Sequence, residues 1–176
     1  MVKSQIDRME EGLARVKRRL PALPAEEILL SRLIVLLGRE YSARYDRLLR
    51  PRGLTEADFR VLAALFSHQQ GSAFPSDLCA SMAQSPANIT RIADALVERG
   101  LITRIASEQD RRRMVLQITP HGTELLHDCL PCTTELARGA FAVLSQEEVR
   151  QLTAQLRRVA EALDRSDAQD DPAVAS

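Results

Sequence analysis

The segment that most constrains the fold of this chain lies between Gly100 and Gly122. Two runs rich in β-branched residues, Leu101–Ala106 and Met114–Ile118, flank a charged stretch, which is typical of a β-hairpin. Directly before the hairpin, residues 85–100 have the apolar spacing of an amphipathic helix. A polar-faced helix followed by a basic hairpin predicts a winged helix-turn-helix unit, with DNA as the expected partner.

The helix before the hairpin has the features of a recognition helix. Ser85 is expected to cap it and Pro86 to occupy its first position, where the missing N–H is not needed. The stripe expected to be buried consists of Ile89, Ile92, Ala93, Leu96 and Val97. The residues expected on DNA are Ser85, Ala87, Asn88, Thr90 and Arg91. Asp94 and Glu98 should turn away from the phosphates. Alone, this pattern also fits an ordinary helix with a solvated polar face.

The tip of the predicted hairpin strengthens the case for DNA. It holds Asp110, Arg111, Arg112 and Arg113. Three consecutive arginines repel one another and add nothing to a core, whereas they suit phosphates or a narrow minor groove. Asp110 can hold one of them through a bidentate pair. We therefore predict that these four residues complete the DNA interface.

Helices are expected on both sides of this unit. The apolar spacing predicts helices over residues 4–19 and from about Glu26 to Arg50. Thr55 and Asp58 form a capping box for the next helix, and the Gln70–Phe74 loop ends it. The residues expected on the inner face of that helix are Phe59, Leu62, Leu65 and Phe66. Pro75 opens a short helix to about Ala83.

The last third of the chain is predicted to be helical. A helix should start at Thr119-Pro120, and Pro131 should kink it or split it in two. Ser145 and Glu148 form a second capping box. The apolar positions of the following helix are spaced 3, 4, 3, 4 and suit helix–helix pairing: Val149, Leu152, Leu156, Val159 and Leu163. Residues 166–176 are acidic and polar, and we expect them to be disordered.

Composition excludes several classes of protein. Acidic and basic residues balance at 24 each, with a basic excess in residues 1–52 and an acidic excess in residues 114–176. The charge pattern therefore permits a DNA partner but does not demand one. No apolar run is long enough to span a membrane and the N-terminal residues lack the apolar region of a signal peptide, so we expect a cytoplasmic protein. The three cysteines make a secreted disulfide framework unlikely.

Other functions were weighed against DNA binding. The chain has no Gly-rich phosphate loop, HExxH or GxSxG motif, so we expect no enzyme and no cofactor. Cys129 and Cys132 form a CxxC, and Pro131 could place Cys132 near a helix start, which leaves a redox-sensing repressor as one alternative. Zinc binding through these cysteines with His121 and His127 is disfavoured by their spacing. A winged helix used only for protein contacts is a further alternative, but it would not need the arginine tip.

The hairpin and the residues after it resemble a known signature. Asp110-Arg111-Arg112-Arg113, followed by Leu116-Gln117-Ile118-Thr119-Pro120-His121-Gly122, resembles the DxR…LTxxG pattern of the MarR family of bacterial regulators. The similarity covers roughly residues 30–165. It implies a repressor that binds a pseudo-palindromic operator in double-stranded DNA as a homodimer, with Arg112 as the minor-groove arginine and Asp110 as its partner. It leaves residues 1–25 unexplained.

The resemblance also implies a ligand and a domain layout. Family members release DNA when small aromatic or lipophilic compounds bind a cleft, and some control efflux or stress genes. An aromatic wall with a cation suits such ligands, and the candidates are Tyr41, Arg44, Tyr45, Phe66 and His68, although the two tyrosines could equally be packing residues. We expect a mainly α fold with a small β-hairpin wing (α+β). The expected parts are an N-terminal extension (1–25), a helical dimerisation region (26–53 and 120–165) and a winged helix-turn-helix domain (54–119).

Overall fold

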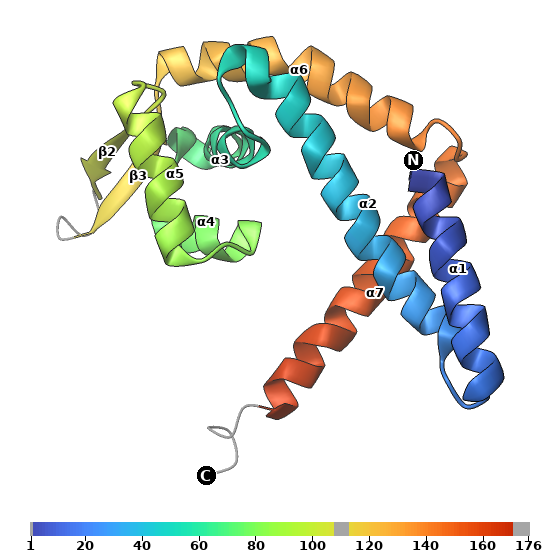
Figure 1. The fold of residues 1–176 in the computed structure, drawn as a ribbon. Helices are drawn as coiled ribbons and strands as arrows, with labels where there is room; N and C mark the ends of the chain where they lie inside the picture. The colour runs from blue at the N-terminus through green and yellow to red at the C-terminus, as the bar shows by residue number, and fades with distance from the viewer. Residues whose placement is uncertain (1, 108–112, 171–176) are drawn as a thin grey trace. The chain divides into compact units, whose positions relative to one another are not determined.

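The computed structural model describes residues 2–107 and 113–170 of the chain (Figure 1). The chain divides into two compact units, residues 1–133 and residues 134–176. The described part is mainly helical with one small antiparallel sheet, as the sequence predicts. None of its helices combines the length and the apolar run needed to cross a membrane.

Two helices begin the first unit, α1 (Val2–Arg19) and α2 (Ala25–Leu49). α1 packs against α2 and buries Leu13, which is one of the apolar positions that predicted this helix. A short turn joins them, in which the N–H of Leu23 donates to the carbonyl of Leu20 over 3.0 Å. The N-terminal segment is therefore a helical hairpin arm on α2.

The helix α3 (Glu56–Ser67) follows a 3-10 turn (Arg50–Arg52) and starts with the predicted capping box. The N–H of Asp58 donates to the hydroxyl of Thr55, and the N–H of Thr55 donates to the Asp58 carboxylate. Phe59, Leu62 and Leu65 are buried as expected. Phe66 was wrongly placed on the inner face: its side chain is 47% exposed, because the buried stripe of α3 turns toward Val61 instead.

The sheet has three strands, whereas the sequence predicted only a two-stranded hairpin. Its order is β1 (Ser72–Ala73), β3 (Met114–Ile118) and β2 (Ile102–Ala106), all antiparallel. β1 lies in the segment expected to be a loop, after a 3-10 turn (Gln69–Gly71). It pairs Ala73 with Leu116 of β3. A two-residue strand has no detectable alternation, so only its pairing with β3 reveals it.

Two helices of the winged unit close its core, α4 (Pro75–Met82) and α5 (Pro86–Glu98). Gly100 ends α5 with φ +68°, a conformation that glycine adopts without strain. The N–H of Gly100 donates to the Val97 carbonyl and that of Leu101 to the Leu96 carbonyl, both over 2.9 Å, which is a Schellman motif. The chain thereby turns sharply from the helix into β2.

The helix α6 (Pro120–Phe141) contains Pro131 but runs without interruption, so the prediction of a split at this proline is wrong. A proline removes one helical hydrogen bond, and the neighbouring residues can continue the helix when the freed carbonyl reaches water. His127, whose carbonyl would have accepted that bond, is an exposed residue, as is Pro131 itself. The cost of the lost bond is therefore small enough for α6 to continue.

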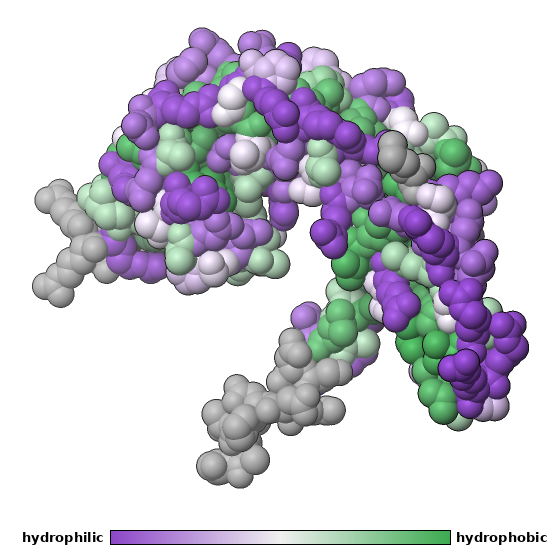
Figure 2. Space-filling model, viewed as in Figure 1, coloured by the Kyte–Doolittle hydropathy of each residue, from purple (hydrophilic) through white to green (hydrophobic). Residues whose placement is uncertain are grey.

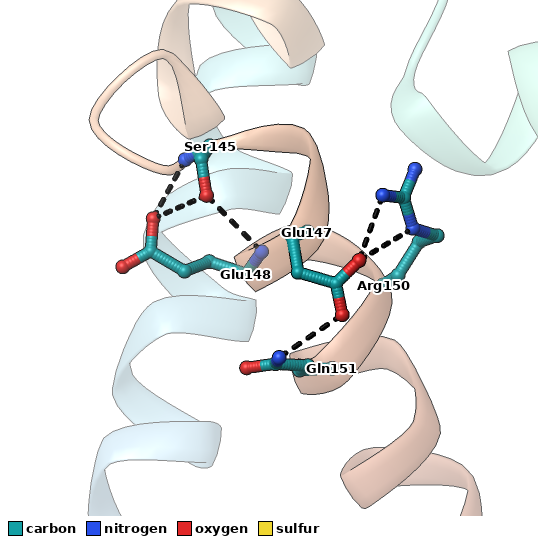
Figure 3. Close-up of polar contacts among 5 residues, drawn as sticks. All are labelled: Ser145, Glu147, Glu148, Arg150 and Gln151. Atoms are coloured by element: carbon teal, nitrogen blue, oxygen red, sulfur yellow. Dashed lines mark hydrogen bonds and ion pairs between the residues drawn. The ribbon is translucent and has the colours of Figure 1, made fainter.

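The last helix, α7 (Gln146–Asp170), starts with the second predicted capping box (Figure 3). The Glu148 carboxylate accepts hydrogen bonds from the N–H of Ser145 (2.8 Å) and from its hydroxyl (2.7 Å). The bond from the Ser145 N–H, and to a smaller extent the bond from its hydroxyl, lower the pKa of Glu148. The expectation of disorder from residue 166 is wrong for residues 166–170, which belong to α7; residues 171–176 lie outside the described part.

Candidate nucleic-acid interface

The helix α5 is held on the winged unit by one face only. Ile89, Ile92, Ala93 and Leu96 are buried in the core, as the sequence predicts, and Val97 is partly buried. The Ser85 hydroxyl caps the helix by accepting the N–H of Asn88 over 3.3 Å. The opposite face of α5 is therefore exposed and fixed in orientation.

The residues predicted to contact DNA lie on or beside this exposed face. Ser85, Ala87, Thr90 and Arg91 are exposed, while Asn88 is half-buried at its edge. Nη2 of Arg91 donates to Oδ1 of Asn88 over 2.8 Å. The Asn88 amide donates in turn to the side chain of Gln84. These bonds join Asn88 and Arg91, so the two groups best suited to base edges lie side by side on this face.

The wing follows the recognition helix directly. At its described end, the N–H of Ser107 donates to the carbonyl of Arg113 over 2.8 Å and so closes the hairpin. The guanidinium of Arg113 stacks over the ring of Phe74, with Cζ 3.9 Å from the ring centroid. The predicted tip residues Asp110, Arg111 and Arg112 lie outside the described residues.

One ion pair of this region was missed by the sequence analysis. Nη2 of Arg104, in β2, lies 2.5 Å from Oδ1 of Asp94, in α5. Asp94 was expected to turn away from DNA, but no partner was assigned to it. The sequence offers no signal for this pair, because the residues of β2 do not alternate in burial and Arg104 is placed on the core-facing side only by its cross-strand neighbour, the buried Leu116.

The five predicted ligand residues form no single cluster. The rings of Tyr41 and Tyr45 meet edge to face, 5.3 Å apart, and Tyr45 also lies 6.0 Å from Phe59. Burial, and then the neighbouring Tyr41, raise the pKa of Tyr45 to about 12. Tyr45 packs against the core, and Arg44 is exposed one residue before it on α2.

The other two ligand candidates lie elsewhere in the winged unit. The ring of Phe66 meets that of His127 of α6 edge to face, at 5.3 Å. His68 lines an open cavity of about 320 Å³ between β1, the wing strands and the start of α4. Phe74 and Asp77 line the same cavity. The structure thus brings Tyr41 and Tyr45 together, whereas Phe66 meets His127 and His68 lines the cavity beside the wing.

The cysteines of α6 are poorly placed for redox chemistry. Cys129 is fully buried, and burial raises the pKa of its thiol, which disfavours the reactive thiolate. Cys132 donates to the Cys129 carbonyl over 3.1 Å from the middle of an unbroken helix, not from a helix start as the sequence suggested. Among the described residues, no three His, Cys, Asp or Glu side chains gather around a possible metal position.

The order of these elements defines the class of the protein. A capped helix with an exposed polar face follows a shorter helix and precedes a β-hairpin wing, and this arrangement is a winged helix-turn-helix. Residues 52–113 match the sequence profile of the MarR family. The chain is 36% identical over 141 residues to the transcriptional repressor MprA of Escherichia coli K12, covering 80% of each protein. The chain belongs to the MarR family and is a DNA-binding transcriptional regulator.

Solved structures of the family have the same fold. A mutant MarR from Escherichia coli, complexed with operator DNA, matches 76% of this chain and 95% of its own, with a TM-score of 0.69 and 25% identity. CouR from Rhodococcus jostii RHA1, bound to p-coumaroyl-CoA, matches 74% of this chain and 91% of its own, with a TM-score of 0.68 and 25% identity. The first of these structures contains operator DNA, and the second contains p-coumaroyl-CoA.

Proposed function

We propose that this protein is a repressor that binds a pseudo-palindromic operator as a homodimer and leaves it when a small aromatic or lipophilic compound binds. The observation that carries the proposal is the exposed polar face of α5 beside the wing, on which Arg91 donates a hydrogen bond to Asn88. The MarR–operator complex and the repressor MprA support the DNA part. The CouR complex supports the ligand part.

In this proposal each group of residues has its own role on DNA. Asn88 and Arg91 contact base edges, and Ser85, Ala87 and Thr90 line the same face of α5. Asp110, Arg111, Arg112 and Arg113 belong to the wing, which contacts phosphates or the minor groove. The arginines supply the positive charge that a nearly neutral chain needs at this surface.

The test measures affinity by fluorescence anisotropy on DNA from upstream of the protein's own gene and on random DNA. Arg91→Ala and Asn88→Ala should weaken binding to the operator more than to random DNA, because base contacts specify the sequence. Arg15→Ala is the matched control, since Arg15 is an exposed arginine of α1 paired with Glu11 and lies outside the proposed interfaces. Equal losses on both DNAs would remove α5 from sequence recognition.

We place the dimer contact in residues 26–53 and 120–165. The apolar seam of α7 is unusually exposed within the single chain: Leu152 is 39% and Leu156 44% exposed. Figure 2 shows apolar, green surface along α7 near the grey C-terminal residues. Such a stripe has the spacing of a helix pair, and a second copy of the chain is a partner of matching chemistry. Two recognition helices related by a two-fold axis would then meet half-sites about one helical turn apart.

We place the effector beside Tyr41, Arg44 and Tyr45, where an exposed cation lies next to two rings that meet edge to face, with Phe66 and His68 as further candidates. A bound anion would release DNA by changing the spacing of the recognition helices, and the controlled genes would serve efflux or stress responses.

The release test adds 2-hydroxybenzoate or 2,4-dinitrophenol to the protein–operator complex. Both should release the wild-type protein, and Arg44→Ala should need more of either compound. Arg47→Ala, an exposed arginine three residues further along α2, is the matched control and should respond as the wild type does. Release at unchanged concentrations from the Arg44→Ala variant would remove this site.

A further inference from the structure

The carboxylate of Asp94 lies on the polar face of α5, the face proposed to meet DNA. It follows Thr90 by four residues and Arg91 by three, which makes these side chains neighbours on the helix surface. A lone carboxylate at this place would repel the DNA phosphates. An acidic residue on a DNA-facing surface therefore calls for a role other than DNA contact.

The wing supplies a partner for this carboxylate. Arg104 reaches Asp94 from the middle of β2, the outer strand of the sheet on this side, with 2.5 Å between Nη2 and Oδ1. The strand β2 packs against α5, so the ion pair spans a contact that already exists between the two elements. It joins the proposed recognition helix directly to the wing.

A second contact holds the other strand of the wing. Arg113, just before β3, places its guanidinium 3.9 Å from the centroid of the Phe74 ring, a cation–π geometry. Phe74 is the N-cap residue of α4, the first helix of the helix-turn-helix. One strand of the wing is thus tied to α5 and the other to α4.

We propose that the Asp94–Arg104 ion pair and the Arg113–Phe74 stack are positioning contacts that make the wing and the recognition helix meet DNA as one rigid unit. This inference rests on the proposed function. The Asp94 and Arg104 side chains are 58% and 39% exposed, so their pair adds little to global stability. The wing strands have only five residues each. The two contacts can therefore set the orientation of the wing relative to α5, and this orientation decides whether wing and helix contact DNA together.

The direction in which one substitution changes operator affinity tests the role of the ion pair. Asp94→Asn removes the charge but keeps the shape of the side chain. If Asp94 only repelled phosphates, operator affinity would rise; positioning predicts a fall, by up to about fivefold. Glu98→Gln is the matched control, because it removes the same charge from the same helix, and affinity should hold or rise.

A double-mutant cycle then links the effect to the wing. In an Arg104→Ala background, Asp94→Asn should cause no further loss, whereas Asp94→Glu in the wild-type background should retain most of the affinity. Two results would overturn the proposal. One is a rise in operator affinity for Asp94→Asn alone, and the other is a double variant whose loss of affinity equals the sum of the losses from Asp94→Asn and Arg104→Ala.

Hydrogen exchange on the free protein gives a readout that does not need DNA. Asp94→Asn and Phe74→Leu should each speed amide exchange in residues 102–106 and 114–118 without changing exchange in α3, while Phe74→Tyr should preserve protection. If the wild type binds its operator but the two variants exchange these strands at the wild-type rate, the positioning role of the contacts is overturned and the proposed function is not. Faster exchange in a protein that binds no DNA would instead overturn the proposed function.

Discussion

Replacing Gly122 by alanine should destabilise the fold, although alanine is the better helix former. Gly122 is buried in the first turn of α6, where a Cβ would stand 2.1 Å from the carbonyl oxygen of Leu101 and 3.0 Å from a carbon of Ile118. The obstacle at 2.1 Å is backbone, so no rotamer change relieves it. The start of α6 or the turn after α5 has to move by about 1 Å to restore an ordinary contact.

The size of the effect follows from what that movement breaks. The Leu101 carbonyl accepts the N–H and the hydroxyl of Thr119, each over 3.1 Å, and the Thr119 hydroxyl accepts the N–H of Gly122 over 3.0 Å. Overpacking of this kind costs roughly 1–3 kcal/mol, and weakened hydrogen bonds add about 1 kcal/mol. Better helix propensity returns up to about 1 kcal/mol. The net loss in the free energy of unfolding should be about 1–3 kcal/mol.

Urea unfolding at one fixed protein concentration measures this loss. Gly139→Ala is the matched control in the same helix, because a Cβ there meets nothing within 4 Å. The control should gain about 0.5–1 kcal/mol from helix propensity alone. A Gly122→Ala variant as stable as the wild type would refute the close approach of α6 to Leu101.

Further expectations concern assembly, the wing, a helix cap and a buried phenol. Leu152→Asp with Leu156→Asp would bury carboxylates in the proposed dimer contact and should yield monomers or unfolded chains by light scattering, with loss of DNA binding; dimers that bind normally would contradict that contact. Arg112→Ala should weaken operator binding by roughly 1–3 kcal/mol at unchanged melting temperature, and an unchanged dissociation constant would exclude Arg112 from the interface. Thr55→Ala should cost about 1 kcal/mol of unfolding free energy in urea, whereas no change would mean that the α3 cap is not stabilising. Because the pKa of Tyr45 is raised to about 12, its phenol ionises first in the unfolded chain, so its contribution to stability should be constant below pH 10 and fall as pH rises toward 12. Tyr45→Phe should remove the late step of a phenolate absorbance titration, and the absence of a late step in the wild type would contradict the burial.

The sequence by itself determined the local elements and their order. Local residues set the caps at Thr55, Ser85 and Ser145, the glycine that ends α5 and the two β-branched runs of the wing strands. Each of these signals depends on backbone hydrogen bonding and side-chain direction inside one segment, so it can be identified without knowing the rest of the fold. The predicted helix-turn-helix and wing follow from them.

Only the tertiary structure decided which distant residues meet. The two-residue strand β1 exists because β3 lies beside it, and Phe66 is exposed because the core closes on other residues of α3. Arg104 pairs with Asp94, and Arg113 stacks on Phe74, although the segments that hold these partners share no periodicity. Periodicity predicts on which face of its own helix or strand a side chain lies, but not which residue it contacts. That contact depends on how elements from separate parts of the chain pack together.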